Sequence, residues 1–291
     1  MELYEIQGGE KELDGVIGIT AEILPRLIDL TGPVYLEGFD EPITADEALL
    51  TIQYDTNFGF LERGLEREER KQSIVELAEV LMERIERATY LEKLEIAGLV
   101  YDMARENHIK MYVEDIEAQN RIKELGFDGS IPEVSGDYLF VVDSNMGALK
   151  TDYFMERAIS QTVKECEAGF CTTVEITYTN TATEATPLNN DYRSYTRVYL
   201  AEDAFVNTVD GNEDDWPVDY SIEFGKKVAG FEVIVPFGAS RTVTLEYVTP
   251  VRENYSLNVQ KQPGVEEIDF SLEVEDKKFE ENLRTDRVFV P

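Results

Sequence analysis

The first half of the chain carries apolar residues at helical spacing. In the second half of Glu62–Ile85 they recur three and four positions apart, which predicts an amphipathic helix with one buried face. That face consists of Ile74, Leu77, Ala78, Leu81, Met82 and Ile85. Further helices are expected over 89–107 and from Asp115 to Gly126, where a glycine is typical just after a helix end.

The beginning of the chain alternates apolar runs with one helical segment. Leu13–Ile19 is expected to be a buried strand, and Thr20 caps a helix over Ala21–Leu30. Val34–Phe39 then predicts a second strand, so the stretch forms a strand–helix–strand unit, which is a building block of layered α/β and α+β domains. The other elements expected in this half are a helix capped by Thr44 and strands at His108–Val113 and Asp137–Asp143.

From about Tyr153 onward the apolar period changes to two. Apolar and polar residues alternate over short segments with turn signals between them, which is typical of antiparallel strands in a sandwich. Ala158–Glu165 also fits a helix, but its partner across the cysteine loop favours a strand. The other expected strands are Thr172–Asn180, Tyr195–Leu200, Phe231–Phe237, Arg241–Pro250 and Tyr255–Gln262.

This change of period divides the chain into parts. We expect an α+β protein, with an α/β domain over residues 1–152 and an immunoglobulin-like β-sandwich over 153–263. Residues 264–291 are expected to be a polar tail with one further strand near Phe270–Val274. The 291 residues are enough for two domains with their own cores.

The charge is strongly negative. Sixty acidic residues stand against 27 basic ones, which gives a net charge of −33. Nucleic acid is therefore not an expected partner, because it is held mainly by Lys and Arg on its phosphates. The sequence contains no apolar run of about 18 residues, so no membrane span is predicted. Residues 1–15 lack the features of a signal peptide, so for an exported protein the signal or anchor is expected upstream of Met1.

The densest cationic cluster lies at the entry to the predicted helix of Glu62–Ile85. Its members are Arg63, Arg67, Arg70 and Lys71. Cations at a helix start oppose the helix dipole, so they suit a site in which backbone N–H groups and basic side chains hold an anion. Glutamates lie between them, and Glu66–Arg70 has the spacing of an ordinary surface ion pair. An anion site and a solvated helix face are the alternative interpretations.

Cys166 and Cys171 are the only cysteines, and they bracket a turn-like tetrapeptide between two expected strands. A disulfide that closes a hairpin fits this spacing if the compartment is oxidising. Two reduced structural thiols are the alternative. A zinc site is not predicted, because two thiols without further ligands cannot complete one.

A weak calcium candidate lies between two expected strands of the second half, Tyr195–Leu200 and Phe231–Phe237. Asp210, Asn212 and Asp214 have the opening spacing of a calcium loop, but Asp215 and Ser221 occupy the positions that require Gly and Glu. An acidic loop between strands is the alternative. No glycine-rich phosphate loop is present, so no nucleotide cofactor is predicted.

Two further polar features have structural alternatives. Asn145 and Lys150 follow Asp143 at the end of a strand, where they form either a polar site or a capped turn. His108 is the only histidine, and the sequence points to no nucleophile that would complete a triad with it.

Taken in order, these segments resemble a bacterial cell-envelope family, the domain of unknown function 4012 (DUF 4012). The resemblance runs from about Asp14 to Gly264. It is carried by Asp14–Val34, Ile43–Leu49, Glu69–Gln72 (ERKQ), Gly126–Ile131 (GFDGSI), Asp137–Phe154, Tyr195–Leu200 (YTRVYL) and Tyr255–Gly264 (YSLNVQKQPG).

The first of these blocks is also similar to the LytR-CpsA-Psr fold, whose enzymes move polyprenyl-pyrophosphate-linked glycopolymers onto the cell wall. The R-x-x-R-Q entry of that family to a long helix resembles Arg67, Arg70 and Gln72. In that family the arginines hold the pyrophosphate, so the resemblance implies an anion site here, with Mg²⁺ as the cofactor if the chain is a transferase. Gln53 stands where the family places an Arg, and the family's early acidic segments would lie upstream of Met1. The chain is therefore expected to be the C-terminal part of a longer exported protein.

The resemblance implies a non-catalytic extracytoplasmic protein of the cell envelope, with a structural or interaction role at the cell surface. The alternatives are a LytR-CpsA-Psr-like phosphotransferase and a carbohydrate-binding module built on the sandwich. The implied partners are a cell-wall glycopolymer or a polyprenyl phosphate lipid. No catalytic residue is predicted.

Overall fold

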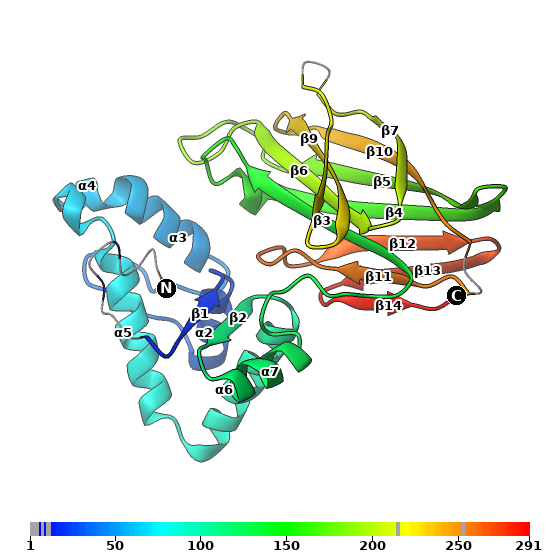
Figure 1. Cartoon of the computed structure of the whole chain (residues 1–291). Coiled ribbons are helices and arrows are strands. Elements are labelled where there is room, and N and C mark those ends of the chain that lie inside the picture. The colour runs from blue at the N-terminus through cyan, green and yellow to red at the C-terminus, as the bar shows by residue number, and fades with distance from the viewer. Residues whose placement is uncertain (1–5, 7–8, 10–12, 214–215, 252–253) are drawn as a thin grey trace. The chain divides into compact units, whose positions relative to one another are not determined.

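The computed structural model describes residues 6, 9, 13–213, 216–251 and 254–291. The chain divides into two compact units, Met1–Ser130 and Ile131–Pro291. Helices gather in the first unit and strands in the second, which agrees with the expected α+β class (Figure 1). The boundary expected at residue 152 is corrected to residue 130, because β3 (Asp137–Asn145) pairs with strands of the second unit.

The first unit packs helices beside a two-stranded antiparallel sheet. The sheet consists of β1 (Gly15–Ile19) and β2 (Ile109–Val113). Apolar residues of α2 (Ile23–Thr31), α5 (Gln72–Arg87) and α6 (Tyr90–Arg105) form the main core together with residues of α3 (Ala48–Tyr54) and of the segment that precedes it. The other helical elements are η1 (Asp55–Gly59), α4 (Phe60–Glu62), η2 (Arg67–Glu69) and α7 (Ile116–Glu124).

Two helices begin where the sequence predicted them. Thr89 caps α6 by accepting a hydrogen bond from the backbone N–H of Glu92, and Asp115 caps α7 through the N–H of Ala118. At the start of α2, however, Thr20 is not the cap, because its hydroxyl lies 2.9 Å from Nδ1 of His108.

Three expectations for the first unit are wrong. β1 is not buried, because β2 is its only partner among the described strands, and Ile17 remains 62% exposed. Val34–Phe39 forms no strand beyond a single bridge between Val34 and Ile43. On α5, Leu77 and Leu81 are buried as predicted, whereas Ile74, Ala78 and Met82 are exposed, since the core that α5 shares with α2 covers only one side of the helix.

The second unit consists of two six-stranded sheets. One has the strand order β13-β12-β4-β5-β10-β7, and the other has the order β14-β11-β3-β6-β9-β8 (Figure 1). Their facing side chains enclose one continuous apolar core. The strands are β4 (Met155–Cys166), β5 (Gly169–Asn180), β6 (Tyr192–Ala201), β7 (Phe205–Asp210), β8 (Asp219–Glu223), β9 (Lys226–Val235), β10 (Ser240–Thr249), β11 (Leu257–Gln260), β12 (Ile268–Val274), β13 (Lys277–Leu283) and β14 (Arg287–Phe289), and η3 (Thr151–Phe154) precedes β4.

The period of two predicted this unit well. Every strand expected between 158 and 262 overlaps an observed strand, and Ala158–Glu165 lies within β4, so the helical alternative is wrong. In residues 264–291 the strand expected near Phe270–Val274 is confirmed as β12, but the rest is not a tail, because it contains β13 and β14. Alternate residues of β12 are buried against the core, which explains why this segment is a strand, and it pairs with β4 in a parallel register.

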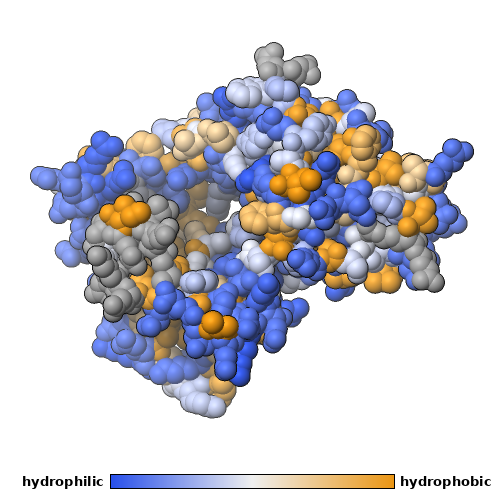
Figure 2. All heavy atoms as spheres, viewed as in Figure 1, coloured by the Kyte–Doolittle hydropathy of each residue, from blue (hydrophilic) through white to orange (hydrophobic). Residues whose placement is uncertain are grey.

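Hydrophilic residues cover most of the surface visible in Figure 2, with hydrophobic residues scattered between them. In the part of the chain that the structure describes, no helix has both the length and the apolar character needed to cross a membrane.

Candidate functional site

Strand β3 carries two carboxylates into the space between the sheets. Side chains alternate along a strand, so Asp137 and Asp143 share the face of Leu139 and Val141, which belong to the apolar core. Asp137 is 1% exposed and Asp143 is 9% exposed. A buried carboxylate is costly unless it is paired and hydrogen-bonded, so its partners decide what it can do.

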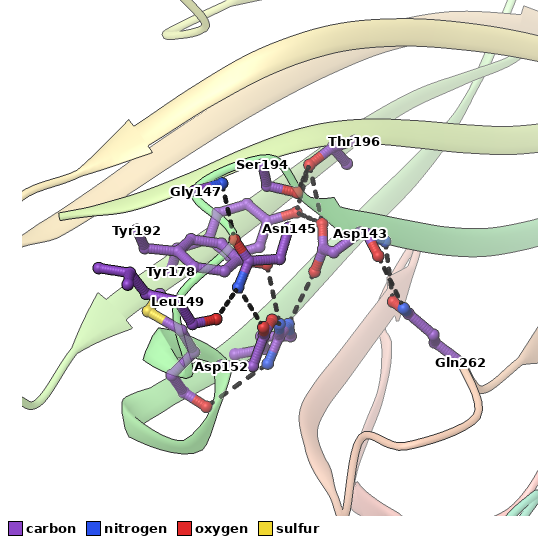
Figure 3. Close-up of polar contacts among 12 residues, drawn as sticks. Asp143, Asn145, Gly147, Leu149, Asp152, Tyr178, Tyr192, Ser194, Thr196 and Gln262 are labelled. Atoms are coloured by element: carbon purple, nitrogen blue, oxygen red, sulfur yellow. Dashed lines mark hydrogen bonds and ion pairs between the residues drawn. The ribbon is translucent and has the colours of Figure 1, made fainter. Parts of the chain in front are cut away.

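Asp143 is bonded by side chains from both sheets (Figure 3). The hydroxyls of Tyr178 and Thr196 each donate to Oδ1 over 2.8 Å, and Nε of Arg157 donates to Oδ2 over 2.7 Å. Thr196 lies on β6 beside β3, whereas Arg157 and Tyr178 lie on β4 and β5 of the opposite sheet. The carboxylate therefore links the two sheets through an ion pair and hydrogen bonds.

The side chains around Arg157 keep its guanidinium positively charged. Its Nη2 donates to the hydroxyl of Tyr192 over 3.1 Å and lies 3.8 Å from a carboxylate oxygen of Asp152. Burial acts to lower the pKa of Arg157, but the charge and hydrogen bond of Asp143 together with Tyr192 and Tyr178 outweigh it and raise that pKa above its ordinary value. The guanidinium therefore stays protonated and cannot act as a base.

The tyrosines of the cluster also keep their protons. Burial raises the pKa of Tyr178 well above its ordinary value, and the charge of Asp143 adds to this effect. The same two causes raise the pKa of Tyr192. Both phenols stay neutral near pH 7, so neither is activated as a nucleophile or base. The cluster is built to hold the sheets together.

The turn after β3 closes on the same cluster (Figure 3). Nδ2 of Asn145 donates to the carbonyl oxygen of Leu149 over 3.0 Å, and the N–H of Gly147 donates to Oδ1 of Asn145 over 2.9 Å. The backbone N–H of Lys150 donates to the carbonyl oxygen of Leu188 over 2.7 Å. The structure thus has the capped turn, which was one of the two interpretations of Asn145 and Lys150.

Asp137 forms a second cluster at the other end of β3. The hydroxyls of Tyr247 and Tyr255 donate to Oδ2 over 2.7 and 2.9 Å, and Nε2 of Gln161 donates to the hydroxyl of Tyr255 over 3.0 Å. Gln161 lies on β4 and Tyr247 on β10, so this carboxylate also bonds across to the opposite sheet. Burial raises the pKa of Tyr247 well above its ordinary value, and Asp137 adds to this effect.

Arg63 is separated from the predicted anion site by its own ion pair. Its Nε and Nη2 donate to the two carboxylate oxygens of Asp55 over 2.9 and 2.7 Å. Its guanidinium lies 5.0 Å from the ring centroid of Phe39. Asp55 is only 3% exposed, so its charge needs this partner, and Arg63 serves the fold of the first unit rather than a ligand.

Arg67, Arg70 and Lys71 remain at the surface. Arg67 begins η2, and Lys71 is the residue that precedes the first turn of α5. All three are exposed, and within the described residues their side chains form no ion pair or hydrogen bond. The expected Glu66–Arg70 pair does not form; instead, the N–H of Glu66 donates to the side chain of Glu69 in a capping box.

Cys166 and Cys171 form a disulfide in the structure, with their Cα atoms 5.9 Å apart. The bond joins the end of β4 to the start of β5, so it closes the hairpin that the sequence predicted.

The calcium candidate is only partly described. Asp210 ends β7, and Nδ2 of Asn212 donates to the carbonyl oxygen of Glu213 over 3.2 Å. Asp214 lies outside the described residues. Elsewhere, no three His, Cys, Asp or Glu side chains of the described residues are arranged to hold a metal ion.

Sequence reasoning missed the partners of the two buried carboxylates. Arg157, Tyr178 and Tyr247 come from strands that were predicted, but sequence does not show which strands face each other. A usable signal was present in Asp137–Asp143, where a period of two places both acidic residues on the apolar face of the strand.

No family model matches the chain, and no curated protein matches it. Among solved structures, one described as a "putative nutrient binding protein" from Legionella pneumophila is similar over 47% of this chain and 54% of that chain. The two sequences are 9% identical, and the TM-score is 0.29. A likeness this distant supports no argument about function.

Proposed function

We propose that this protein is a non-catalytic extracytoplasmic protein of the cell envelope, with a structural or interaction role and an immunoglobulin-like sandwich, as its resemblance to DUF 4012 implies. The observation that carries the proposal is the disulfide between Cys166 and Cys171. Disulfides persist in oxidising compartments and are rare in the reducing cytosol.

The interior of the second unit supports a non-catalytic role. Its two buried carboxylates are occupied by cross-sheet hydrogen bonds, and the tyrosines that contact them have raised pKa values and stay protonated. A catalytic base or nucleophile would instead need a pKa near the working pH and access to a substrate. These clusters stabilise the sandwich, which suits a durable surface protein.

A thiol count tests the compartment. The unreduced protein is isolated from cells that make it naturally, denatured in the presence of a thiol reagent, and compared with a reduced sample. We expect no reactive thiol before reduction and two after it. Two reactive thiols in the unreduced sample would refute the extracytoplasmic assignment.

The second candidate is a transferase of LytR-CpsA-Psr type, and one observation favours it. Arg67, Arg70 and Lys71 are exposed and unpaired within the described residues at the start of α5, where backbone N–H groups also point outward. Among the described residues, no three His, Cys, Asp or Glu side chains are arranged to hold a metal ion beside these cations. An anion-binding role of the segment is therefore better supported than catalysis.

Binding to vesicles that contain a polyprenyl phosphate tests this candidate. Arg70→Ala is expected to weaken binding by about tenfold, the loss of one charge-assisted contact. Arg87→Ala is the matched control, because Arg87 lies at the other end of α5 and is paired with Glu83 over 2.6 Å. Equal binding of both variants and the unaltered protein would exclude the anion site.

A further inference from the structure

The outer face of the sheet that contains β4 carries an open trough of about 580 Å³. It lies over β13, β12, β4, β5 and β10, and the strand register arranges its side chains in two rows across the sheet. The first row is Asn282, Asp269, Ala158, Thr177 and Thr242, and the second is Glu280, Ser271, Ser160 and Glu175.

Side-chain size forms the trough. The two central strands, β12 and β4, place the small residues Ala158, Ser160 and Ser271 on this face. Longer side chains on β13 and β5, such as Glu280 and Glu175, stand on either side. Neighbouring strands lie about 4.8 Å apart, so roughly 14 Å separates the two outer strands of this group, which is wide enough for an extended polymer.

The lining is dense in hydrogen-bonding groups and contains no cation. Four hydroxyls, one amide and several carboxylates line it, but no Lys or Arg does. Glu280 is paired with Lys278 over 2.5 Å. The side chains of Glu175 and Asp269 form no hydrogen bond or ion pair within the described residues, and both residues are exposed, so their carboxylates are available to accept from a ligand.

The carboxylates and hydroxyls of the lining indicate which class of ligand the trough can bind. An anionic ligand would be repelled by the carboxylates, and an apolar ligand would leave the hydroxyls of Ser160 and Ser271 without partners. The rings nearest the trough are no stacking platform, since Phe270 belongs to the core and is 3% exposed. A chain of hydroxyl groups supplies donors to the carboxylates and both donors and acceptors to the serines and threonines.

We propose that this trough binds a segment of a polysaccharide that carries no negative charge. Glu175 and Asp269 accept hydrogen bonds from sugar hydroxyls, and Ser160 and Ser271 form the floor against which the sugar rings rest. The proposal gives a partner class to the interaction role proposed above and rests on that role. Its test is separate, because the thiol count reports the compartment whether or not any sugar binds.

A glycan array followed by isothermal titration tests the proposal on the full chain. The probes are neutral oligosaccharides such as cellohexaose and chitohexaose, the anionic hexagalacturonate, and hexalysine as a cation without hydroxyls. We expect a neutral oligosaccharide to bind with an affinity that raised salt leaves unchanged, and hexagalacturonate to show no binding. Failure of every neutral glycan on the array would overturn the proposal. Salt-sensitive binding of hexalysine alone would also overturn it, since that result indicates general attraction of cations.

Variants then assign the site to the trough. Glu175→Gln and Asp269→Asn are each expected to weaken sugar binding about tenfold, and Ser160→Tyr should abolish it by filling the floor. Glu246→Gln is the matched control, because Glu246 is exposed on β10 outside the trough lining. All four positions lie on strands whose inner faces are unchanged, and thermal unfolding checks that each variant is folded. Equal loss of binding in Glu246→Gln, or no loss in the three trough variants, would place the binding elsewhere.

Discussion

Replacing Asp143 by Asn tests the cluster that joins the two sheets. The change keeps the shape of the side chain but removes its charge. Nε of Arg157 then faces an amide instead of a carboxylate, and the guanidinium loses its buried counter-ion. The side chains of Asp143 and Arg157 are 2% and 9% exposed, so water cannot replace the lost partner.

The magnitude follows from this burial. Removing one partner of a buried ion pair costs about 3–5 kcal/mol of unfolding free energy, because the other charge is left uncompensated. Asp152 lies 3.8 Å from Arg157 and is half exposed, so it offsets part of the loss. We therefore expect Asp143→Asn to lower the unfolding free energy of the second unit by about 3 kcal/mol, near the lower end of that range.

Urea unfolding followed by tryptophan fluorescence measures this loss. Trp216 is the only tryptophan of the chain and lies in the second unit, so its signal does not report the first unit. With a slope of about 2–3 kcal/mol per molar urea, the midpoint should fall by roughly 1 M.

Two controls make the result specific. Asp276→Asn changes an exposed residue in the turn between β12 and β13 and should alter the unfolding free energy by less than about 0.5 kcal/mol. The double variant Asp143→Leu with Arg157→Met removes both charges and should be more stable than Asp143→Asn. If Asp143→Asn unfolds at the same urea concentration as Asp276→Asn, the cluster does not stabilise the sandwich as described.

Other predictions concern the same unit. Gly169→Ala should lower the unfolding free energy by more than about 2 kcal/mol, because Gly169 has φ +139° and an added Cβ would lie 2.0 Å from a carbonyl oxygen of β10. Gly225→Ala should lower it by about 1 kcal/mol, because Gly225 has φ +67° but an added Cβ would lie in open space. Thermal unfolding compares the two variants. Cys166→Ser together with Cys171→Ser should lower the unfolding free energy by about 2 kcal/mol, as expected for a short closed loop, and a reducing agent should have the same effect on the unaltered protein but none on the variant. The pKa of Tyr178 is raised above 10.0 in the folded state, so the unfolded state releases this proton first as the pH rises. The stability that Tyr178 contributes is therefore fully present below pH 10 and is lost at higher pH. Denaturation across this range should show the decline, and the decline should be smaller in Tyr178→Phe.

The sequence predicted local structure more reliably than the environment of each element. The alternation in Ala158–Glu165 and Thr172–Asn180 identified the β4–β5 hairpin, because the period of two and the turn between the cysteines are local properties. The same reasoning expected Leu13–Ile19 to be buried. An apolar run predicts a strand that is suited to a buried position. Whether the strand is buried depends on how many other strands and helices lie against it, and β1 pairs with β2 alone among the described strands.

The polar tail shows a second limit of the method. Residues 264–291 are rich in charged groups, yet β12 and β13 are regular strands. In β12 the charged side chains of Asp269 and Glu273 lie on one face, while Phe270 and Leu272 reach the core. The apolar residues near Phe270–Val274 indicated β12, but the charged composition of the segment hid β13 and β14.

For the candidate site residues, too, the sequence predicted local features better than the environment of each side chain. Arg67, Arg70 and Lys71 were found at the surface because a cationic run without nearby apolar residues has no reason to be buried. Arg63 was misassigned, because its partner Asp55 lies in a helical turn whose side-chain direction is fixed only by the fold.

The parallel pairing of the last strands has a consequence for the order in which the protein is made. β11 lies beside β3, and β12 lies beside β4, although these partners come from opposite ends of the second unit's sequence. Until β11 and β12 have been synthesised, β3 and β4 each present an open edge to which other strands can pair. Contacts between such distant segments form slowly. A chain that pauses before Leu257 therefore holds both sheets unfinished, and the nascent protein depends on being kept from aggregation until its last strands emerge.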